Sequence, residues 1–477
     1  MAIKRFYADA DNTITNAFKR NNLTRATNAN MGESDILESF QIYGRATTSS
    51  IELSRVLIKF PIEDIKTELD AGRIPSGSSY YLKMFDAPNN KTTPRGYEMN
   101  IIPLSRSWTE GRGLDMETYL DTGSSNWVSA SDGVTWTSEG GDYYGTAFTA
   151  SFDLGYEDLE LDVTSLVGEW IDELSTAGTG KPNYGVIVKM TNFFESASYS
   201  TYTKEFFARG TEYFFKKPHI EVRFNDSVLD DRGSFYASSS LASAEDNTNN
   251  IYLYNSIRGQ LKNIPGHGPG SEIYVQVYDE ASAGTLLTPT VITGGYVSTG
   301  VYSASLDLNT TKELVYDRWY DSTLLTCYHT GSIKVKSFSS NDANPNPVYV
   351  NAIQNMKSSY RSDEVARFRL FTRFKDWCPT IYVVATKDIE TLAVTDAYYK
   401  IFRIVDNYEA VPYGTGSDQH TKMSYDSDGN YFNFDMSVLE PNYQYGIKLL
   451  FYINGQYQEQ KETFKFRVEK DLWEYSN

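Results

Sequence analysis

Cysteine and histidine are scarce in this sequence, which excludes several classes of protein. The chain has two cysteines and four histidines among 477 residues. Two distant cysteines supply too few disulfide cross-links to stabilise a chain of this length, so the disulfide-dense class of small secreted proteins is excluded. We expect Cys327 and Cys378 to be free, buried thiols rather than a disulfide. The histidines are scattered, and the sequence contains no His-Glu-x-x-His zinc motif.

Long apolar runs are also missing. No run reaches the ~18 residues that a membrane-spanning helix needs. The opening residues, MAIKRFYADADN, lack the apolar core of a signal peptide. We therefore expect a protein made in a cytoplasm, with no membrane partner and no use of the ordinary export signal.

Positive charge is in short supply. The formal net charge is −18, and no Lys/Arg block is long enough to form a basic patch. Such a chain repels nucleic-acid phosphates, so we expect no nucleic-acid partner. The acidic balance favours solubility and suits the binding of divalent cations.

Aromatic residues and short strand-like segments are abundant. Aromatics make up 14% of the chain, with 37 tyrosines, and such rings favour half-buried β surfaces. Short segments in which apolar and polar residues alternate, bounded by Gly, Ser, Asn and Asp, predict strands. The clearest of these segments are 54–60, 79–86, 184–190, 219–224, 271–279, 300–308, 331–338, 366–374, 398–405, 430–436, 445–453 and 462–469.

The strands fall into three series separated by polar stretches. A chain of this length predicts two to four domains. We expect a first domain at 1–225, a linker at 226–250, and further domains at 251–340 and 348–470. The last two have the size of an immunoglobulin-like sandwich.

One stretch, ELDVTSLVGEWIDE (160–173), is helical in type. We expect Thr164 or Ser165 to cap its first turn. An earlier stretch, PIEDIKTELDAG (61–72), fits either a second short helix or an irregular crossover. Apolar residues recur at the three-and-four spacing of one helix face at Leu166, Val167, Trp170, Ile171 and Leu174.

Several segments in a fixed order resemble a known module. They are SRVLIKFPI (54–62), SRSWTEGRG (105–113), DGVTWTSEGG (132–141), the helical stretch, NYGVIVKM (183–190) and KKPHIEVRF (216–224). Together they resemble the DNRLRE-type β-sandwich, a jelly-roll-like domain of bacterial surface and carbohydrate-related proteins. The resemblance covers about residues 1–225 and implies that the helix is the connector before the YGV strand. The chain departs from the pattern in the inserts 112–131 and 192–210.

The whole chain also resembles virion structural proteins of contractile-tailed marine phages. That resemblance implies an all-β protein, a jelly-roll-like sandwich followed by two immunoglobulin-like β-sandwich domains. It further implies a neck or tail component of a virion that contacts other virion proteins as a symmetric homo-oligomer. The alternatives are a glycan-binding adhesin or tail-fibre protein contacting the host surface, and, third, a glycoside-cleaving enzyme.

The sequence contains no recognisable catalytic set. It has no phosphate-binding loop of the G-x-x-x-x-G-K-[ST] type and no G-x-S-x-G nucleophile elbow. Glu110 beside Trp108 is the most suggestive pair, but no second acid can be placed at glycosidase spacing. We expect Trp108 and Trp136 to fill the core or its rim. We therefore predict a protein that is not an enzyme, with no catalytic residues and no cofactor.

Asp9, Asp11 and Asn12 are the metal-binding candidates. Calcium takes six to eight oxygen ligands, which side chains of this kind supply. A polar edge strand without an ion explains the same residues. A second acidic stretch, SYDSDGNYFNF (424–434), lacks the closing Glu of a calcium loop, and Asp428-Gly429 there predicts a hairpin turn.

Aromatic residues in the Gly/Ser-rich inserts are the binding candidates. Exposed rings of this kind serve protein interfaces or glycan stacking, and we favour protein contacts over sugar. The candidates are Trp127, Tyr143, Tyr144, Tyr199 and Tyr202.

Overall fold

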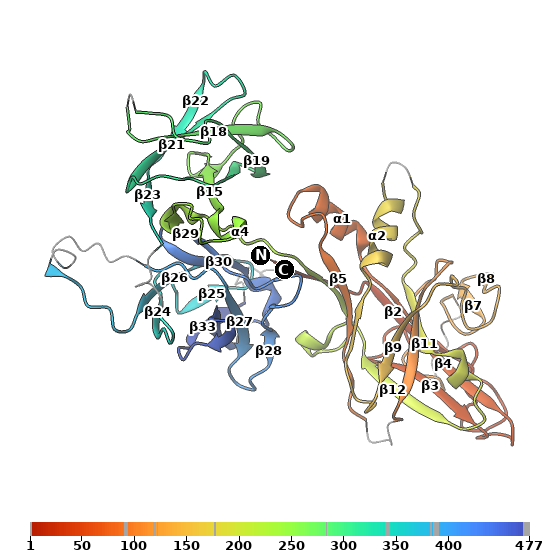
Figure 1. Cartoon of the computed structure of the whole chain (residues 1–477). Helices are drawn as coiled ribbons and strands as arrows, with labels where there is room; N and C mark the ends of the chain where they lie inside the picture. The colour runs from red at the N-terminus through yellow and green to blue at the C-terminus, as the bar shows by residue number, and fades with distance from the viewer. Residues whose placement is uncertain are drawn as a thin grey trace. The chain divides into compact units, whose positions relative to one another are not determined.

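The computed structural model confirms the predicted all-β sandwich fold (Figure 1). It divides into two compact units, an N-terminal unit of residues 2–224 and a C-terminal unit of residues 225–470. The residues that the structure describes are 2–89, 94–117, 121, 123–175, 178–282, 284–338, 344–381, 384 and 391–470.

The N-terminal unit is a sandwich of two antiparallel sheets. One sheet has the order β1-β13-β5-β10, and the other has the order β12-β3-β4-β11-β6-β9, with β2 paired to β4. Its elements are β1 (Ile3–Tyr7), β2 (Ala10–Thr15), β3 (Ile36–Tyr43), β4 (Ile51–Lys59), α1 (Ile62–Asp70), β5 (Ser79–Met84), β6 (Tyr97–Pro103), β7 (Ser129–Ser131), β8 (Val134–Thr135), β9 (Phe148–Phe152), β10 (Leu159–Asp162), α2 (Thr164–Glu173), β11 (Val186–Met190), α3 (Asn192–Glu195), β12 (Thr201–Phe207), η1 (Phe214–Lys216) and β13 (His219–Arg223).

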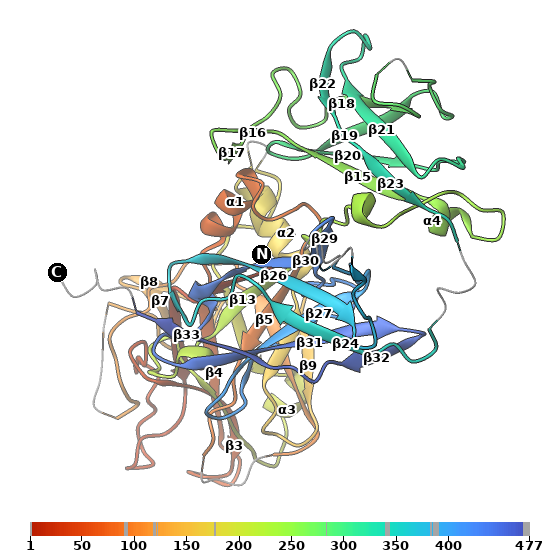
Figure 2. The same cartoon turned by 90° about the vertical axis from the view of Figure 1, so that its left-hand side faces the viewer.

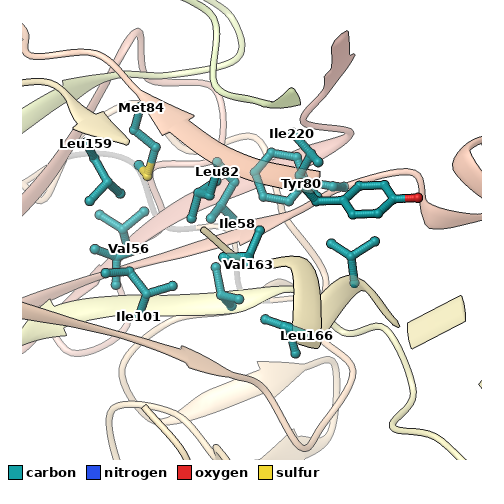
Figure 3. Packing of buried hydrophobic residues seen from close by; sticks show 14 of the residues in the cluster. Val56, Ile58, Tyr80, Leu82, Met84, Ile101, Leu159, Val163, Leu166 and Ile220 are labelled. Atoms are coloured by element: carbon teal, nitrogen blue, oxygen red, sulfur yellow. The ribbon is translucent and has the colours of Figure 1, made fainter. Parts of the chain in front are cut away.

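The central strand β4 is buried on both of its faces. Val56 and Ile58 belong to the core cluster between the two sheets, with Leu82 and Ile101 (Figure 3). Leu57 lies between them in sequence and belongs to a second apolar cluster. Alternate strand residues point to opposite faces, so burial of both faces produces the continuous apolar run of this segment.

The second cluster is built by the long excursion between β6 and β9. Its members include Leu57 and Ile187 of the larger sheet together with Trp127 and Trp136 of the excursion, and Trp108 packs at its edge. The expectation that Trp108 and Trp136 fill the core or its rim is confirmed. The excursion therefore covers the outer face of the larger sheet.

Helix α2 forms where its apolar periodicity predicts, beside α1 (Figure 1). Leu166 and Trp170 are buried, at 2% exposure each. The predicted cap is wrong: Asp162 Oδ1 accepts from the Thr164 amide at 2.9 Å. The Thr164 hydroxyl instead accepts from the Tyr80 amide at 2.9 Å, which fastens the helix to β5. The stretch 61–72, left open between helix and crossover, holds α1.

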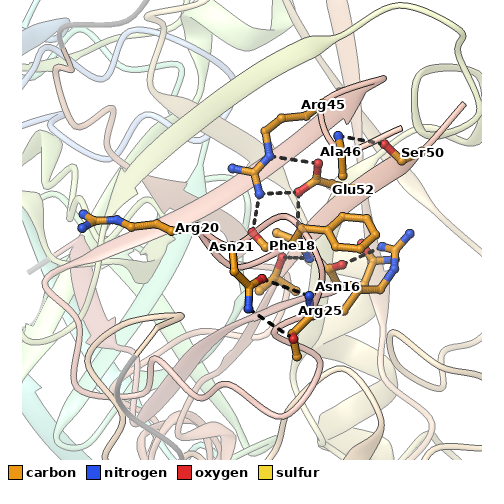
Figure 4. A network of polar contacts seen from close by, with 12 residues as sticks. Asn16, Phe18, Arg20, Asn21, Arg25, Arg45, Ala46, Ser50 and Glu52 are labelled. Carbon is orange, nitrogen blue, oxygen red and sulfur yellow. Dashed lines mark hydrogen bonds and ion pairs between the residues drawn. The ribbon is translucent and has the colours of Figure 1, made fainter. Parts of the chain in front are cut away.

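A polar network closes one end of β2, β3 and β4 (Figure 4). The buried carboxylate of Glu52 accepts from the Phe18 amide at 2.7 Å and from Arg45 Nε at 3.0 Å. Asn16 Oδ1 accepts from the Leu53 amide at 2.7 Å. These bonds satisfy backbone groups at the strand ends, so this network is structural.

The C-terminal unit begins with a middle module formed by one large sheet and the separate two-stranded sheet β16-β17. The large sheet has the order β14-β23-β21-β18-β19-β20-β15, with β22 paired to β21, and β14 runs parallel to β23. Its elements are η2 (Asp231–Gly233), β14 (Phe235–Tyr236), α4 (Ala244–Asn247), β15 (Asn249–Tyr254), β16 (Ser256–Ile257), β17 (Gln260–Leu261), β18 (Glu272–Tyr278), β19 (Ile292–Ser298), β20 (Val301–Leu306), β21 (Leu314–Tyr320), β22 (Cys327–Thr330) and β23 (Ile333–Lys336).

Residues 226–250, where we expect a linker, are built into this unit. They contain η2, β14, α4 and the start of β15. Phe235 is fully buried in the core of the middle module with Ile251 and Trp319. Residues 339–343, next to the expected boundary between 251–340 and 348–470, lie outside the described residues.

The last module is a two-sheet sandwich. Its sheets have the orders β24-β26-β30-β29 and β25-β33-β31-β27-β28, with β32 paired to β31. Figure 2 shows β24, β26 and β30 side by side. Its elements are β24 (Tyr349–Ile353), β25 (Ser359–Arg361), β26 (Val365–Phe374), β27 (Ala397–Arg403), β28 (Glu409–Val411), β29 (Ser424–Asp426), β30 (Gly429–Asp435), η4 (Met436–Val438), β31 (Gln444–Ile453), β32 (Gln456–Glu459) and β33 (Phe464–Glu469).

The core of this last module is aromatic. Phe432 stacks on Tyr399 with ring centroids 3.9 Å apart and lies 5.1 Å from Phe368. The predicted hairpin is confirmed, because β29 and β30 pair antiparallel around Asp428-Gly429. Such rings bury large apolar areas, which stabilises the packing of the two sheets against each other.

Both cysteines are free, as predicted, but the expectation of burial is wrong. Cys327 lies on β22 and Cys378 lies after β26, and both are exposed. Cys327 lies on a strand at the margin of its sheet, where the surrounding residues are also largely exposed. In the part of the chain that the structure describes, no helix is long and apolar enough to cross a membrane.

Candidate binding site

Trp127, predicted as an exposed ring, is instead buried at 4% exposure. It packs in the cluster on the outer face of the larger sheet. Arg55 lies over its ring at 5.0 Å from the guanidinium carbon to the ring centroid. A large apolar ring gains most free energy by covering that sheet face, so it is unavailable to a partner.

The four predicted tyrosines lie in two different segments. Tyr199 and Tyr202, at 52% and 51% exposure, lie before and within the edge strand β12. Tyr143 and Tyr144 lie in the excursion before β9. Tyr143 is 37% exposed and lines a cavity, whereas Tyr144 is half-buried and has Lys181 Nζ 5.4 Å from its ring centroid.

The cavity beside Tyr143 has a volume of about 520 Å³ and is open to solvent. This volume falls in the range of small-molecule binding sites. β4 supplies one lining residue, and the others come from the segments after β6 and β8. The lining residues are Arg55, Ser105, Arg106, Thr137, Ser138, Glu139, Gly141, Asp142 and Tyr143.

A buried ionic cluster anchors Arg55 in the wall of the cavity. Its Nε and Nη2 donate to the carboxylate of Glu195 at 2.9 and 2.8 Å, and its Nη1 donates to the Gly140 carbonyl at 2.8 Å. Lys189 Nζ lies 2.9 Å from Glu195 and 5.9 Å from the ring centroid of Tyr143. Burial lowers the pKa of Lys189, and the Glu195 carboxylate opposes that shift.

A second ion pair, Arg106 with Asp142, fixes the loop that carries Tyr143. Arg106 Nε donates to Asp142 at 2.7 Å. The amides of Thr137 and Ser138 also donate to the Asp142 carboxylate, at 2.9 and 3.1 Å. Burial alone would raise the pKa of Asp142, but these donors outweigh it and lower the pKa. The carboxylate is therefore charged and held in place near neutral pH.

Two glycines let this loop approach the sheet closely. Gly140 has a φ of +88°, and a Cβ there would lie 2.6 Å from Arg55 Nη1 and 2.9 Å from the Trp127 ring. Gly141 has a φ of +107°, with Ile187 beneath it. Only glycine adopts these angles without strain, so the pair places Asp142 and Tyr143 at the cavity.

The proposed calcium ligands do not converge. Asn12 is committed to protein contacts, since its amide donates to the Ser125 carbonyl and its oxygen accepts from the Met31 amide. Asp9 lies 3.9 Å from Lys59, and Asp11 accepts from the Arg209 amide. No group of three or more His, Cys, Asp or Glu among the described residues could hold a metal ion. Asp11 and Asn12 lie on β2, which pairs with β4, and both are buried.

Glu110 is a structural residue rather than half of a carboxylate pair open to substrate. Its two oxygens accept from Arg209 Nε and Nη2, both at 2.6 Å, and one also accepts from the Asp11 amide. Trp108 donates its indole N–H to the Tyr184 carbonyl at 2.9 Å. Trp108 and Glu110, which flank Thr109 in the sequence, thus serve separate parts of the fold.

The sequence identified Tyr143 but missed the charged residues around the cavity. Arg55 is a charge inside the apolar strand SRVLIKF, which is an unusual place for an unpaired cation and was the available signal. No such local signal in the sequence identifies Arg106, Glu139 and Asp142, because the loop segments that bring them together have no regular secondary structure. Only the fold brings them together.

Comparisons with known proteins give no family. No protein-family model matches the sequence, and no curated protein matches it. The tandem Ig repeats of Dlar are 7% identical over 47% of this chain and 90% of that chain, with a TM-score of 0.14. The Yersinia pseudotuberculosis adhesin InvE is 12% identical over 46% and 54% of the two chains, with a TM-score of 0.16. TM-scores this low carry no argument about function.

Proposed function

We propose that this chain is a structural protein of a tailed-phage particle, in the neck or tail, that acts through protein–protein contacts. The observation that carries the proposal is the segment 228–235, which is bonded into both modules of the C-terminal unit. A protein that spaces its neighbours needs modules that hold a fixed relation to each other, and this segment supplies that relation.

The segment first pairs with the last module. Leu229 forms a parallel bridge with Tyr425 of β29. The Tyr425 amide donates to the Val228 carbonyl, and the Asp230 amide donates to the Tyr425 carbonyl, both at 3.0 Å. The Tyr425 hydroxyl donates to Asp231 Oδ1 at 2.7 Å. Residues 228–230 thus extend the edge of that module, and Asp231 adds a side-chain bond to it.

The same segment then enters the middle module. Asp231 Oδ2 accepts from the Asn250 amide at 2.7 Å. Arg232 forms a two-pronged ion pair with the buried Asp317, at 2.7 and 2.8 Å. Phe235 is buried in that module's core. Because Asp231 is bonded to both modules, rotation of one against the other breaks these bonds.

Purified particles test this proposal. Antibodies against the recombinant chain should detect it in phage particles banded in a density gradient. Quantitative mass spectrometry should give a fixed copy number relative to the major tail protein, as expected of a symmetric component. A chain that stays in the soluble lysate, or whose copy number varies among preparations, would contradict a structural role.

A further inference from the structure

We infer that the cavity beside Tyr143 is a binding site for a neutral saccharide. This inference goes beyond the proposed assembly role and does not rest on it. It stands on four features of the cavity: its size, one exposed aromatic ring, a set of fixed polar groups, and the balance of charge.

The aromatic ring is placed for stacking. Tyr143 lines the cavity and is 37% exposed, so part of its ring remains open to a ligand. Its backbone is held by a bridge to Leu104 and by the Gly140-Gly141 turn. A ring held in advance loses little conformational entropy when a sugar face covers it.

The polar groups suit a ligand that both donates and accepts hydrogen bonds. Ser105 and Ser138 offer hydroxyls, which can do either. The Glu139 carboxylate is a pure acceptor, and it is exposed at the cavity. Arg106, with 37% of its side chain exposed, is a pure donor. Sugar hydroxyls match this mixture, whereas an apolar ligand would leave the groups unsatisfied.

The charge balance favours a neutral ligand. The charged residues that line the cavity are two cations, Arg55 and Arg106, and two anions, Glu139 and Asp142. Both cations already bind carboxylates, Arg55 through Glu195 and Arg106 through Asp142. A phosphate or uronate would therefore find no unpaired cation and would face Glu139.

Binding of the full-length chain to immobilised and soluble oligosaccharides tests the inference. The probes are neutral oligomers of glucose, mannose and galactose, with oligomers of uronic acids as the charged comparison. We expect at least one neutral series to bind, and no uronate series to bind more tightly.

Substitutions locate the site. Tyr143→Ala should weaken binding by about tenfold or more, and Tyr143→Phe should retain most of it, because the ring is kept. Glu139→Gln should weaken binding by a smaller factor of about three, since it removes a charge-assisted bond but keeps the shape. Tyr156→Ala is the matched control, because that ring is exposed between β9 and β10 and does not line the cavity, and its affinity should equal the wild type.

The result can go against the inference in three ways. No binding by any neutral series, tighter binding of a uronate series, or equal affinities of Tyr143→Ala and wild type would each overturn it. Circular dichroism and melting of each variant separate loss of binding from loss of fold. If Tyr143→Ala unfolds, Glu139→Gln decides the outcome: an affinity equal to that of the wild type would overturn the inference.

Discussion

Two buried aspartates, one in each unit, have pKa values that are shifted in opposite directions. Asp11 in the N-terminal unit is 1% exposed, and Asp317 in the C-terminal unit is 0% exposed. Asp317 accepts both prongs of Arg232 and also the Trp319 indole N–H at 2.7 Å. Burial would raise the pKa of Asp317, but these partners outweigh burial and lower the pKa.

Asp11 lacks such partners although an arginine is close. Its Oδ2 accepts from the Arg209 amide at 2.6 Å, and its Oδ1 is buried with no partner among the described residues. The guanidinium of Arg209 is taken by Glu110. Burial, with repulsion from Glu110, raises the pKa of Asp11 to about 7. A nearby cation therefore stabilises a buried carboxylate only where its donors reach that carboxylate.

The largest expected effect comes from removing the cation of the satisfied pair. Arg232→Ala leaves Asp317 charged and buried, so it should destabilise the C-terminal unit by about 3–5 kcal/mol. Calorimetry of the full chain measures the shift. Arg73→Ala, which breaks the ion pair with Glu68 at the surface, is the control and should leave the melting unchanged. Equal shifts in the two variants would contradict the comparison.

The unsatisfied aspartate should respond to pH. The pKa of its carboxyl rises from an ordinary 3.8 to about 7 on folding, so the folded chain binds the proton more tightly. The stability that this carboxyl contributes in its protonated form is therefore lost as pH rises from about 4 through 7. Asp11→Asn cannot ionise, and its stability relative to the wild type should grow across that window by roughly 2–4 kcal/mol.

Melting of wild type and variant at pH 4 and pH 8 measures this difference. Asp317→Asn supplies the opposite case. The lowered pKa of Asp317 means that its charged form contributes stability above pH about 4, which is lost as the pH falls. The free energy of unfolding of Asp317→Asn should therefore fall furthest below that of the wild type at pH 8. The comparison fails if both variants respond to pH with the same sign.

A smaller difference in stability is expected between substitutions of two buried tryptophans. Trp319 donates to Asp317, whereas the indole nitrogen of Trp170 has no partner among the described residues. Both rings are almost fully buried. Trp319→Phe should therefore cost about 1.5–3 kcal/mol more than Trp170→Phe, the value of a hydrogen bond to a charged group. Denaturant unfolding of both variants checks the order.

The smallest expected effect is at the shared segment of the C-terminal unit. Tyr425→Phe removes the hydroxyl bond to Asp231 and keeps the ring, at a cost of about 1.5 kcal/mol, the low end for a hydrogen bond to a charged group. Hydrogen exchange at residues 228–232 should accelerate while exchange elsewhere in the unit stays the same. Tyr457→Phe, on an exposed hairpin of the same module, is the control. Unchanged exchange at 228–232 would mean that the bond does not hold the segment.

Much of the fold follows from the sequence because its signals are local. Alternation places β26, β30 and β31 within a residue or two of their observed ends, and the three-and-four spacing places α2. The linker expected at 226–250 rests on composition, which cannot reveal that Phe235 finds a core formed by strands far along the chain. Long-range pairing decides such segments.

The site was only partly predictable for the same reason. Tyr143 is an aromatic residue in a Gly-rich insert, and so is Trp127. Only their exposure to solvent in the folded chain distinguishes the two. Trp127 is buried because Leu57 and Ile187 point outward from the sheet and need cover. Whether a sheet face must be covered by other residues depends on which strands pair. The residue pattern of a single strand does not reveal that pairing.

The parallel pairing of β14 with β23 has a mechanical consequence. In the middle module, β14 follows η2 close to the entry of the chain and β23 is the last strand before its exit, and the two strands run in the same direction. A force that pulls the entry and exit apart therefore shears the bonds between Phe235, Tyr236 and their partners together, rather than opening them one by one. The bond from the Ala237 amide to the Lys336 carbonyl shares that load. Resistance to tension in this module is set by the rate of its forced unfolding.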